Sequence, residues 1–167
     1  MVGNLDISGI DRGTVVTTPE TFLTDEMRQQ AIGLEGAPST TDVEKGAIIK
    51  FAEAIGDDNP VFNDEAAARD GQYGGLVAPP TFLRSMLPSR PELPFDLPFE
   101  RRLDGGSEWE YFYPVRPGDR ITSVARIDDI SERPGRLGVM IIMTTVVTYT
   151  NQLGQVVATQ AGTGIAY

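Results

Sequence analysis

Hydrophobic and polar residues alternate through the last third of the chain, starting near Trp109. Aromatic side chains at Trp109, Tyr111 and Tyr113 alternate with polar ones such as Glu108 and Glu110. This period of two predicts strands at 109–115, 121–130 and 139–149, and a final strand through Val157, Ala161 and Ile165. Turn residues separate these segments at 116–119, 132–136 and 151–154.

Apolar residues in the first half of the chain recur at spacings of three and four. The clearest such face consists of Ile48, Phe51, Ala52 and Ile55. Thr41 stands three residues before Glu44, which is the spacing of a capping box. Gly56 is the residue type that ends helices in a left-handed conformation. The pattern therefore predicts a helix that follows Thr41 and ends at Gly56.

Three further helices are expected in this half. Short ones are predicted at 25–33 and at 65–69, the latter capped by Asn63 or Asp64. Pro79-Pro80 opens another helix, since proline fits the first helical position, and Pro88 ends it. The side chains around that helix are mostly apolar, so we expect it to be buried: Phe82, Leu83, Met86 and Leu87.

Helices come first in this order and an antiparallel meander comes last. The sequence thus predicts an α+β fold in which a long antiparallel sheet wraps around a buried helix. The strand at 139–149 is apolar on both faces. Its second face or its edge can therefore pack on another chain, which indicates an oligomer.

Length and composition indicate one domain of ordinary globular type. The 167 residues are 40% hydrophobic and 23% charged, and we expect one domain over 1–167 with 1–40 as an N-terminal extension. No run approaches the roughly 18 apolar residues of a membrane span, and Met1 to Ile10 contains no basic residue. A cytoplasmic location is expected.

The chain contains no cysteine and no histidine. This excludes disulfides, thiolate nucleophiles, imidazole metal ligands and a histidine general base, and no metal or organic cofactor is predicted. Chemistry performed by this chain alone must use Asp, Glu, Lys, Tyr, Ser or Thr. The net charge of −10 also argues against nucleic-acid binding, because an acidic surface repels phosphate backbones.

Three segments resemble one enzyme family. Residues 51–62 (FAEAIGDDNPVF) are similar to the hydratase motif of MaoC-like proteins, which runs roughly Y-A-x-x-S-G-D-x-N-P-I-H. Residues 78–83 (APPTFL) and 105–119 (GGSEWEYFYPVRPGD) resemble the central-helix start and the first long strand of its N-terminal, FAS1-like dehydratase branch. The resemblance implies a hotdog fold, normally dimeric, over most of residues 41–166.

Active members of that family hydrate or dehydrate the double bond of an acyl thioester with the motif Asp and His. A backbone N–H at the central-helix start holds the thioester oxygen. Here Asp57 matches the motif Asp, but Phe62 stands at the His position and Pro80 at the position of the amide-bearing Gly. Phenylalanine moves no proton and proline has no N–H, so Asp57 is interpreted as a vestige or a turn cap.

The leading hypothesis is a subunit of an (R)-specific enoyl-CoA hydratase or 3-hydroxyacyl thioester dehydratase that acts with a His-bearing hotdog partner. The expected substrate is an acyl-CoA or acyl-carrier thioester. The expected substrate-contacting residues are Asp57, Asn59, Phe62, Thr81 and Phe82. Two alternatives remain open. One is a homodimeric thioesterase or hydratase that uses a carboxylate such as Asp57 or Glu108. The other is an acyl-CoA binding module without chemistry.

Overall fold

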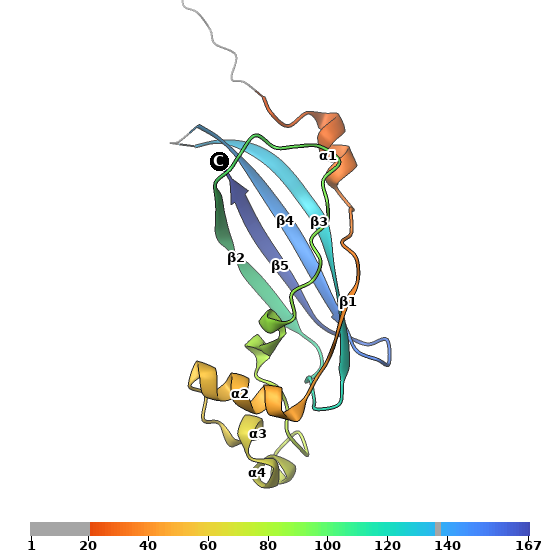
Figure 1. Cartoon of the computed structure of the whole chain (residues 1–167), viewed down its shortest axis with the longest axis vertical. Helices are drawn as coiled ribbons and strands as arrows, with labels where there is room; N and C mark the ends of the chain where they lie inside the picture. The colour runs from red at the N-terminus through yellow and green to blue at the C-terminus, as the bar shows by residue number, and fades with distance from the viewer. Residues whose placement is uncertain (1–20, 136–137) are drawn as a thin grey trace, which may run out of the picture.

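The computed structural model describes residues 21–135 and 138–167. Its centre is a five-stranded sheet of order β1-β3-β4-β5-β2, in which every neighbouring pair is antiparallel (Figure 1). The strands are β1 (Ser39–Asp42), β2 (Arg102–Tyr111), β3 (Arg120–Gly135), β4 (Gly138–Thr150) and β5 (Val156–Ala166). The expected α+β class is therefore confirmed, while the expectations for residues 1–20 lie outside the described part of the chain.

The helices gather mainly at one end of the sheet (Figure 1). They are α1 (Asp25–Ala31), α2 (Lys45–Ile55), α3 (Pro60–Asn63), α4 (Glu65–Asp70) and the 3-10 helix η1 (Pro80–Ser85). Helices α2, α3 and α4 form a lobe beyond the ends of the strands, and α1 lies at the opposite end. No helix in the described part of the chain has the length and apolar character of a membrane span.

Helix α2 begins later than the capping-box spacing predicts. Thr41 lies in β1, opposite Ile121 of β3, and Glu44 is the N-cap without a side-chain bond. The prediction of a Thr41 cap was wrong because residues 39–42 are held in the sheet by pairing with β3. The end was predicted correctly, since Gly56 has φ 70 and its N–H donates to Ala52 and Glu53 carbonyls. Ile55 departs from the predicted apolar face, with 48% of its surface exposed.

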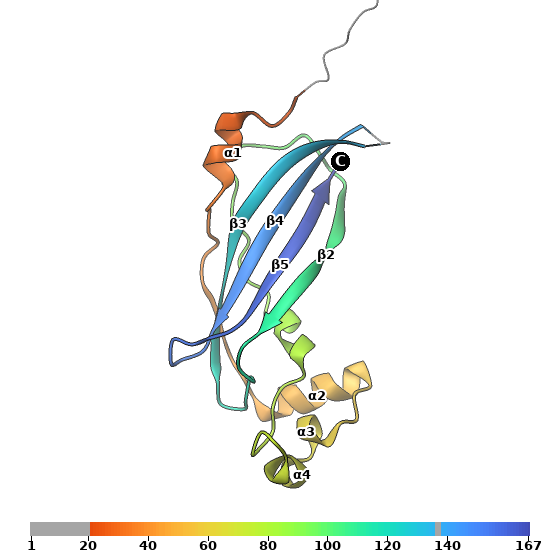
Figure 2. The ribbon, with the colours of Figure 1, turned by 180° about the vertical axis from the view of Figure 1, so that it is seen from behind.

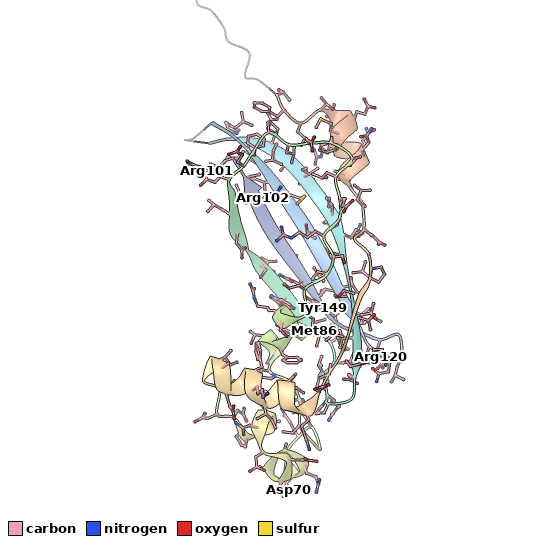
Figure 3. The ribbon with its side chains drawn as sticks, in the orientation of Figure 1. Asp70, Met86, Arg101, Arg102, Arg120 and Tyr149 are labelled. Carbon is pink, nitrogen blue, oxygen red and sulfur yellow. The ribbon has the colours of Figure 1, made fainter. Side chains whose placement is uncertain are left out.

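The helix expected at 80–87 is a single short 3-10 helix. Phe82, Leu83 and Met86 are buried against the sheet as predicted, but Leu87 is 79% exposed. Figure 3 shows Met86 beside Tyr149 of β4 where this helix meets the sheet. The helix cannot continue because the ring of Pro88 disfavours helical geometry at Leu87 and supplies no N–H.

An irregular segment, residues 88–99, replaces helix over much of this sheet face. We call it the proline strap, since Pro88, Pro91, Pro94 and Pro98 occur along it. Its apolar side chains alternate and pack near Ile130, Ile141 and Met143 of the sheet: Leu93, Phe95, Leu97 and Phe99. The strap crosses in front of the sheet in Figure 1 and behind it in Figure 2. Extended chain at this spacing buries every second side chain.

The four predicted strands are all present but differ in extent, and the sequence reading missed a fifth strand, β1. Strand β2 starts at Arg102 and ends at Tyr111, so Tyr113 and Val115 follow it. Strand β3 continues through Gly135, where the sequence suggested a turn. Strand β4 is paired on both edges, so the expected edge contact with another chain cannot come from it. Its second face, with Met140, Ile142 and Val146 half-buried, looks out from the side seen in Figure 2.

Residues 33–42 run along the edge of β3 and hydrogen-bond to it. The amides of Gly33 and Gly36 donate to the Ile127 and Ala125 carbonyls of β3, which extends the line of β1. Gly36 also passes directly against the backbone of Ser89 at the start of the strap. A side chain at position 36 would overlap the Ser89 carbonyl.

We expect Gly36→Ala to lower the free energy of unfolding by about 1–3 kcal/mol, because the added methyl group must displace the strap backbone. Gly46→Ala is the matched control: it lies in α2 with nothing within 4 Å of the new Cβ. That change should stabilise by about 0.5–1 kcal/mol through helix propensity. Urea denaturation of the two variants checks both signs, and equal effects would contradict the close approach.

The ionisation of Tyr149 makes the stability of the fold depend on pH in the alkaline range. Its side chain is 1% exposed, and burial raises its pKa from 10.0 to about 12. The folded state thus favours the neutral phenol, so its contribution is complete below pH 10 and lost as pH rises towards 12. Between pH 10 and 12 the free energy of unfolding of the wild type should therefore fall relative to that of Tyr149→Phe. A pH-independent difference in denaturation experiments would show that Tyr149 does not titrate in this way.

Candidate functional site

The turn that carries the hydratase motif is held by its own polar side chains. The Asp57 carboxylate accepts the Asn59 N–H at 3.1 Å, and the Asn59 side-chain oxygen accepts the Val61 N–H at 3.2 Å. Asn59 is in this way the N-cap of α3. Both groups therefore perform the structural capping that the sequence allowed.

Phe62 is the residue at which the sequence resemblance led us to expect a histidine. It is 9% exposed and packs against Ala52, Val77 and Val61 at the base of the helical lobe. The ring is part of the apolar core and has no atom that can form a hydrogen bond. The position therefore offers no group that accepts or donates a proton.

The start of η1 also lacks the expected donor. Pro79 is buried and Pro80 opens the helix, so neither residue has an N–H. The Ala78 N–H is already used, since it donates to the Val115 carbonyl at 2.8 Å. An amide at position 80 that holds a thioester oxygen is chemically impossible in this chain.

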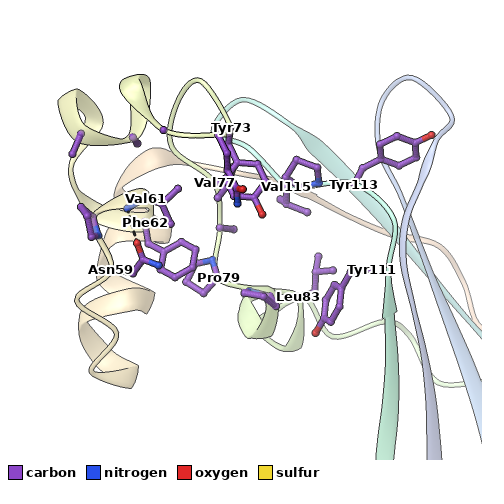
Figure 4. Close-up of a pocket in the computed structure, with 18 of the residues that line it drawn as sticks. Asn59, Val61, Phe62, Tyr73, Val77, Pro79, Leu83, Tyr111, Tyr113 and Val115 are labelled. Carbon is purple, nitrogen blue, oxygen red and sulfur yellow. Dashed lines mark hydrogen bonds between the residues drawn. The ribbon is translucent and has the colours of Figure 1, made fainter.

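A cleft of about 610 Å³ lies between the helical lobe and the chain that follows β2 (Figure 4). We call it the motif cleft. Asn59 and Phe62 line it, whereas the other predicted contacts Asp57, Thr81 and Phe82 do not. Figure 4 shows Asn59, Phe62 and Pro79 on one side, Tyr111 across from them beside Leu83, and Tyr113 turned away. The aromatic residues on that far side are strongly exposed: Tyr111 44%, Phe112 47% and Tyr113 51%.

A second hollow, of about 840 Å³, lies between the proline strap and the sheet. We call it the strap groove. Apolar side chains such as Leu93, Phe99 and Met143 line it, together with Gly162 and Gly164 of β5. Side chains at these two glycines would meet only ordinary contacts, so their absence enlarges the groove rather than relieving a clash.

The strap groove was missed by sequence reasoning. The alternating apolar residues at 93–99 were hidden among prolines and were interpreted as an irregular loop. Gly162 and Gly164 at period two in β5 were the other available signal. In the structure the two glycines lie on the sheet beneath the apolar residues of the proline strap. Small residues under a covering segment leave space between the two layers.

Trp109 joins the groove to the core. Its ring stacks on Tyr111 at 5.7 Å and on Tyr149 at 5.6 Å between ring centroids. Its indole N–H donates to the Ser107 hydroxyl oxygen at 3.2 Å. The predicted aromatic stripe is therefore partly sheet core, at Trp109, and partly exposed surface, at Tyr111 and Tyr113.

The glycine pair and the carboxylate pair of β2 have structural explanations. Gly105 and Gly106 form a bulge: pairing with β5 shifts between Asp104 and Ser107, and Gly106 has φ 102. Glu108 and Glu110 are both exposed, which is a solvated face of the strand. Among residues 21–135 and 138–167 no group of three carboxylates is placed to hold a metal ion.

Comparison with known proteins identifies the relatives of this fold. The model of the "FAS1-like, dehydratase domain region" matches residues 30–160. A UPF0336 protein of Saccharopolyspora erythraea is 37% identical over 128 residues, which is 71% of this chain and 81% of that protein. A probable enoyl-CoA hydratase alpha subunit of Thermomonospora curvata is 34% identical and matches 66% of this chain, but only 40% of that longer protein.

The solved structures agree with this match. The crystal structure of the MaoC-like dehydratase from Rhodospirillum rubrum superimposes with a TM-score of 0.65 and 27% sequence identity, over 83% of this chain and 94% of that one. The hotdog fold expected from the sequence is confirmed, and the segment expected to form its central helix consists here of η1 followed by the proline strap. The chain thus belongs to the MaoC-like hotdog family, in its FAS1-like dehydratase domain branch.

Proposed function

We propose that this chain is the non-catalytic subunit of a heteromeric (R)-specific enoyl-CoA hydratase or 3-hydroxyacyl thioester dehydratase. The observation that carries the proposal is the pair Phe62 and Pro80. These residues stand where the resemblance places the proton-transferring His and the amide that holds the thioester oxygen. Loss of one oxyanion donor alone typically costs about 100- to 1000-fold in rate. With the histidine base also replaced, this chain has neither of the two groups that the resemblance assigns to water addition.

The partner subunit supplies the Asp–His pair in this proposal. The name of the Thermomonospora curvata relative, an alpha subunit, supports a multi-subunit enzyme. The surface available for the partner is the outer edge of β2, which pairs only with β5 among the described strands. Leu103 and Tyr111 on this strand are 55% and 44% exposed. Exposed edges of this kind pair readily with another strand.

This subunit contributes acyl-binding surface. The lining of the strap groove is mixed, with an apolar part that includes Leu93, Phe99 and Met143, and the groove is of the size that holds a drug-sized ligand. Its apolar part suits a long or bulky acyl group carried as a CoA or carrier-protein thioester. The motif cleft, with Asn59 and Phe62, lies beside the η1 start and would contribute to the wall around the reacting end. The proposal assigns the enzyme to the cytoplasm and requires no cofactor.

We expect the purified chain alone to hydrate crotonyl-CoA no faster than buffer. Addition of a hotdog partner with an intact Asp–His motif should restore turnover with saturation at a fixed subunit ratio. Absorbance at 263 nm follows loss of the conjugated double bond. Brisk hydration by the pure chain would overturn the proposal. Thioester hydrolysis without hydration would favour the homodimeric thioesterase instead.

Asp57→Asn separates the proposal from a carboxylate mechanism. The amide keeps an oxygen that accepts the Asn59 N–H, so the turn is preserved while the charge is lost. In the complex, kcat should stay within about twofold of wild type, because Asp57 has no proton to move in this account. A loss of 100-fold or more would assign a chemical role to Asp57.

Gly164→Val tests whether acyl chains lie in the strap groove. Gly164 lines the groove, and a Cβ added there meets only the Met143 carbonyl at 3.9 Å, so we expect the variant to fold. We expect kcat/KM for a long acyl substrate to fall about tenfold, with crotonyl-CoA nearly unchanged, since losing a methylene-sized subsite costs 1–3 kcal/mol, or roughly 10- to 200-fold. An equal effect on both substrates would place the acyl chain elsewhere. Gly46→Ala is the inert control.

A further inference from the structure

Gln160 brings an amide group onto the face of the sheet that the proline strap covers. It lies in β5, where it pairs with Trp109 of β2 on one side and with Val147 of β4 on the other. Val147 belongs to the buried core, and Gln160 lines the strap groove beside it. A polar side chain on a covered sheet face needs hydrogen-bond partners, so the contacts of this amide indicate what it is placed to bind.

Tyr149 fixes which end of the amide faces the groove. Its hydroxyl donates to Oε1 of Gln160 at 3.4 Å. The phenol is buried, and burial raises its pKa to about 12, so it keeps its proton and acts as a donor at neutral pH. An amide held through its oxygen turns its NH₂ group the other way. Nε2 accordingly lies over Gly162, 3.6 Å from the place that a Cβ on that glycine would take.

Nε2 of Gln160 is an open donor. Within residues 21–135 and 138–167 it has no hydrogen-bond acceptor, since the contact of this side chain is made through Oε1. Every buried side-chain nitrogen or oxygen in that part of the chain has a partner. Nε2 is therefore reached from the groove rather than sealed in the core, and a ligand in the groove can accept its hydrogen bond.

The floor around Nε2 is polar, and it presents donors. Ser107, level with Gly162 across the pair β2–β5, accepts from the Arg84 guanidinium at 3.3 Å and from the Trp109 indole at 3.2 Å. Two donors fill the acceptor capacity of a hydroxyl oxygen. Thr145, opposite Gly162 in β4, adds a second hydroxyl to the lining. A carbonyl oxygen suits such a floor, because it accepts two hydrogen bonds and donates none.

The charges of the groove favour a neutral ligand group. Its ionisable lining residues are three carboxylates and two guanidinium groups: Glu92, Asp96, Asp104, Arg90 and Arg102. An anionic ligand gains no net attraction from this set, and an amide N–H does not neutralise a charge. A ketone carbonyl meets the open donor without that cost.

The open donor stands well away from the proposed reacting end. Tyr111 lines the motif cleft, and Ser107, level with Gly162, lies four residues earlier in β2. At the rise of a strand, four residues span roughly 13 Å. An extended acyl chain covers this distance in about ten bonds. The oxygen that reaches Nε2 therefore belongs to the distal part of the acyl group.

We propose that the strap groove takes acyl thioesters that carry a ketone in the distal part of the acyl group, and that Gln160 Nε2 donates a hydrogen bond to the ketone oxygen. Tyr149 is the positioning residue that orients the amide. The inference rests on the proposed function, because it takes the strap groove as the acyl site and the motif cleft as the reacting end.

Two positional isomers test the site: 10-oxododecanoyl- and 5-oxododecanoyl-N-acetylcysteamine. They share composition and differ only in the place of the ketone. We would titrate the purified chain with each by isothermal titration calorimetry and follow the emission of Trp109, the only tryptophan of the chain, which pairs with Gln160. The 10-oxo isomer should bind about 3- to 10-fold more tightly, the range for one net hydrogen bond.

Gln160→Met keeps the length of the side chain and removes the amide, so both isomers should bind equally. Gln160→Glu keeps an acceptor for the Tyr149 hydroxyl but places a carboxylate against the ketone, so the 5-oxo isomer should be favoured. Tyr149→Phe lets the amide flip, which halves the donor population and should lower 10-oxo affinity about twofold with 5-oxo affinity unchanged.

Gln29→Met is the matched control, because Gln29 is exposed in α1 and does not line the groove. It should preserve the full preference for the 10-oxo isomer. Circular dichroism verifies the folding of each variant.

The inference is wrong if the wild type binds the two isomers equally, prefers the 5-oxo isomer, binds neither, or keeps its preference in Gln160→Met. These measurements use no partner and no turnover. A preference that disappears in Gln160→Met supports the donor even if no partner restores hydration. Conversely, an active complex that is indifferent to the place of the ketone would reject the donor and retain the proposed function.

Discussion

The proline strap and the sheet form the contact on which the molecule depends. The apolar face of an antiparallel sheet must be covered, and the sequence resemblance led us to expect a long helix as that cover. Here Pro88 stops η1 after two turns of 3-10 helix, and extended chain takes over. Leu93, Phe95, Leu97 and Phe99 bury alternate side chains against β3 and β4. An extended cover fills less volume than a helix, and the strap groove is the consequence.

The motif cleft is also defined by the packing of the chain around it. Its walls are held by capping contacts and apolar packing rather than by groups that transfer protons. Asp57 and Asn59 are engaged by backbone amides, and Phe62 fills the site with a ring. The described part of the chain offers a groove with apolar and polar walls, an exposed strand edge and a row of exposed aromatic residues. These are the surfaces that the proposed binding subunit would use.

Local sequence signals predicted the elements whose causes are local. Gly56 ended α2 and Asp64 capped α4, because each acts within a few residues. The prediction that Thr41 caps α2 was wrong because Thr41 pairs with Ile121 of β3, 80 residues away, and this pairing overrides the local capping preference. The strap groove could not be predicted, since it depends on which residues of β5 lie beneath residues 88–99. The resemblance supplied the fold and the motif positions. The convergence of Arg84 and Trp109 on Ser107 required coordinates.

The central claim is that protons move only on the partner subunit. The most direct measurement is the hydration rate of the reconstituted complex when the motif histidine of the partner is replaced by alanine and this chain is left intact. The account predicts that turnover falls to the buffer rate although the complex still assembles. Turnover that persists in that complex would show that this histidine-free chain performs the chemistry itself.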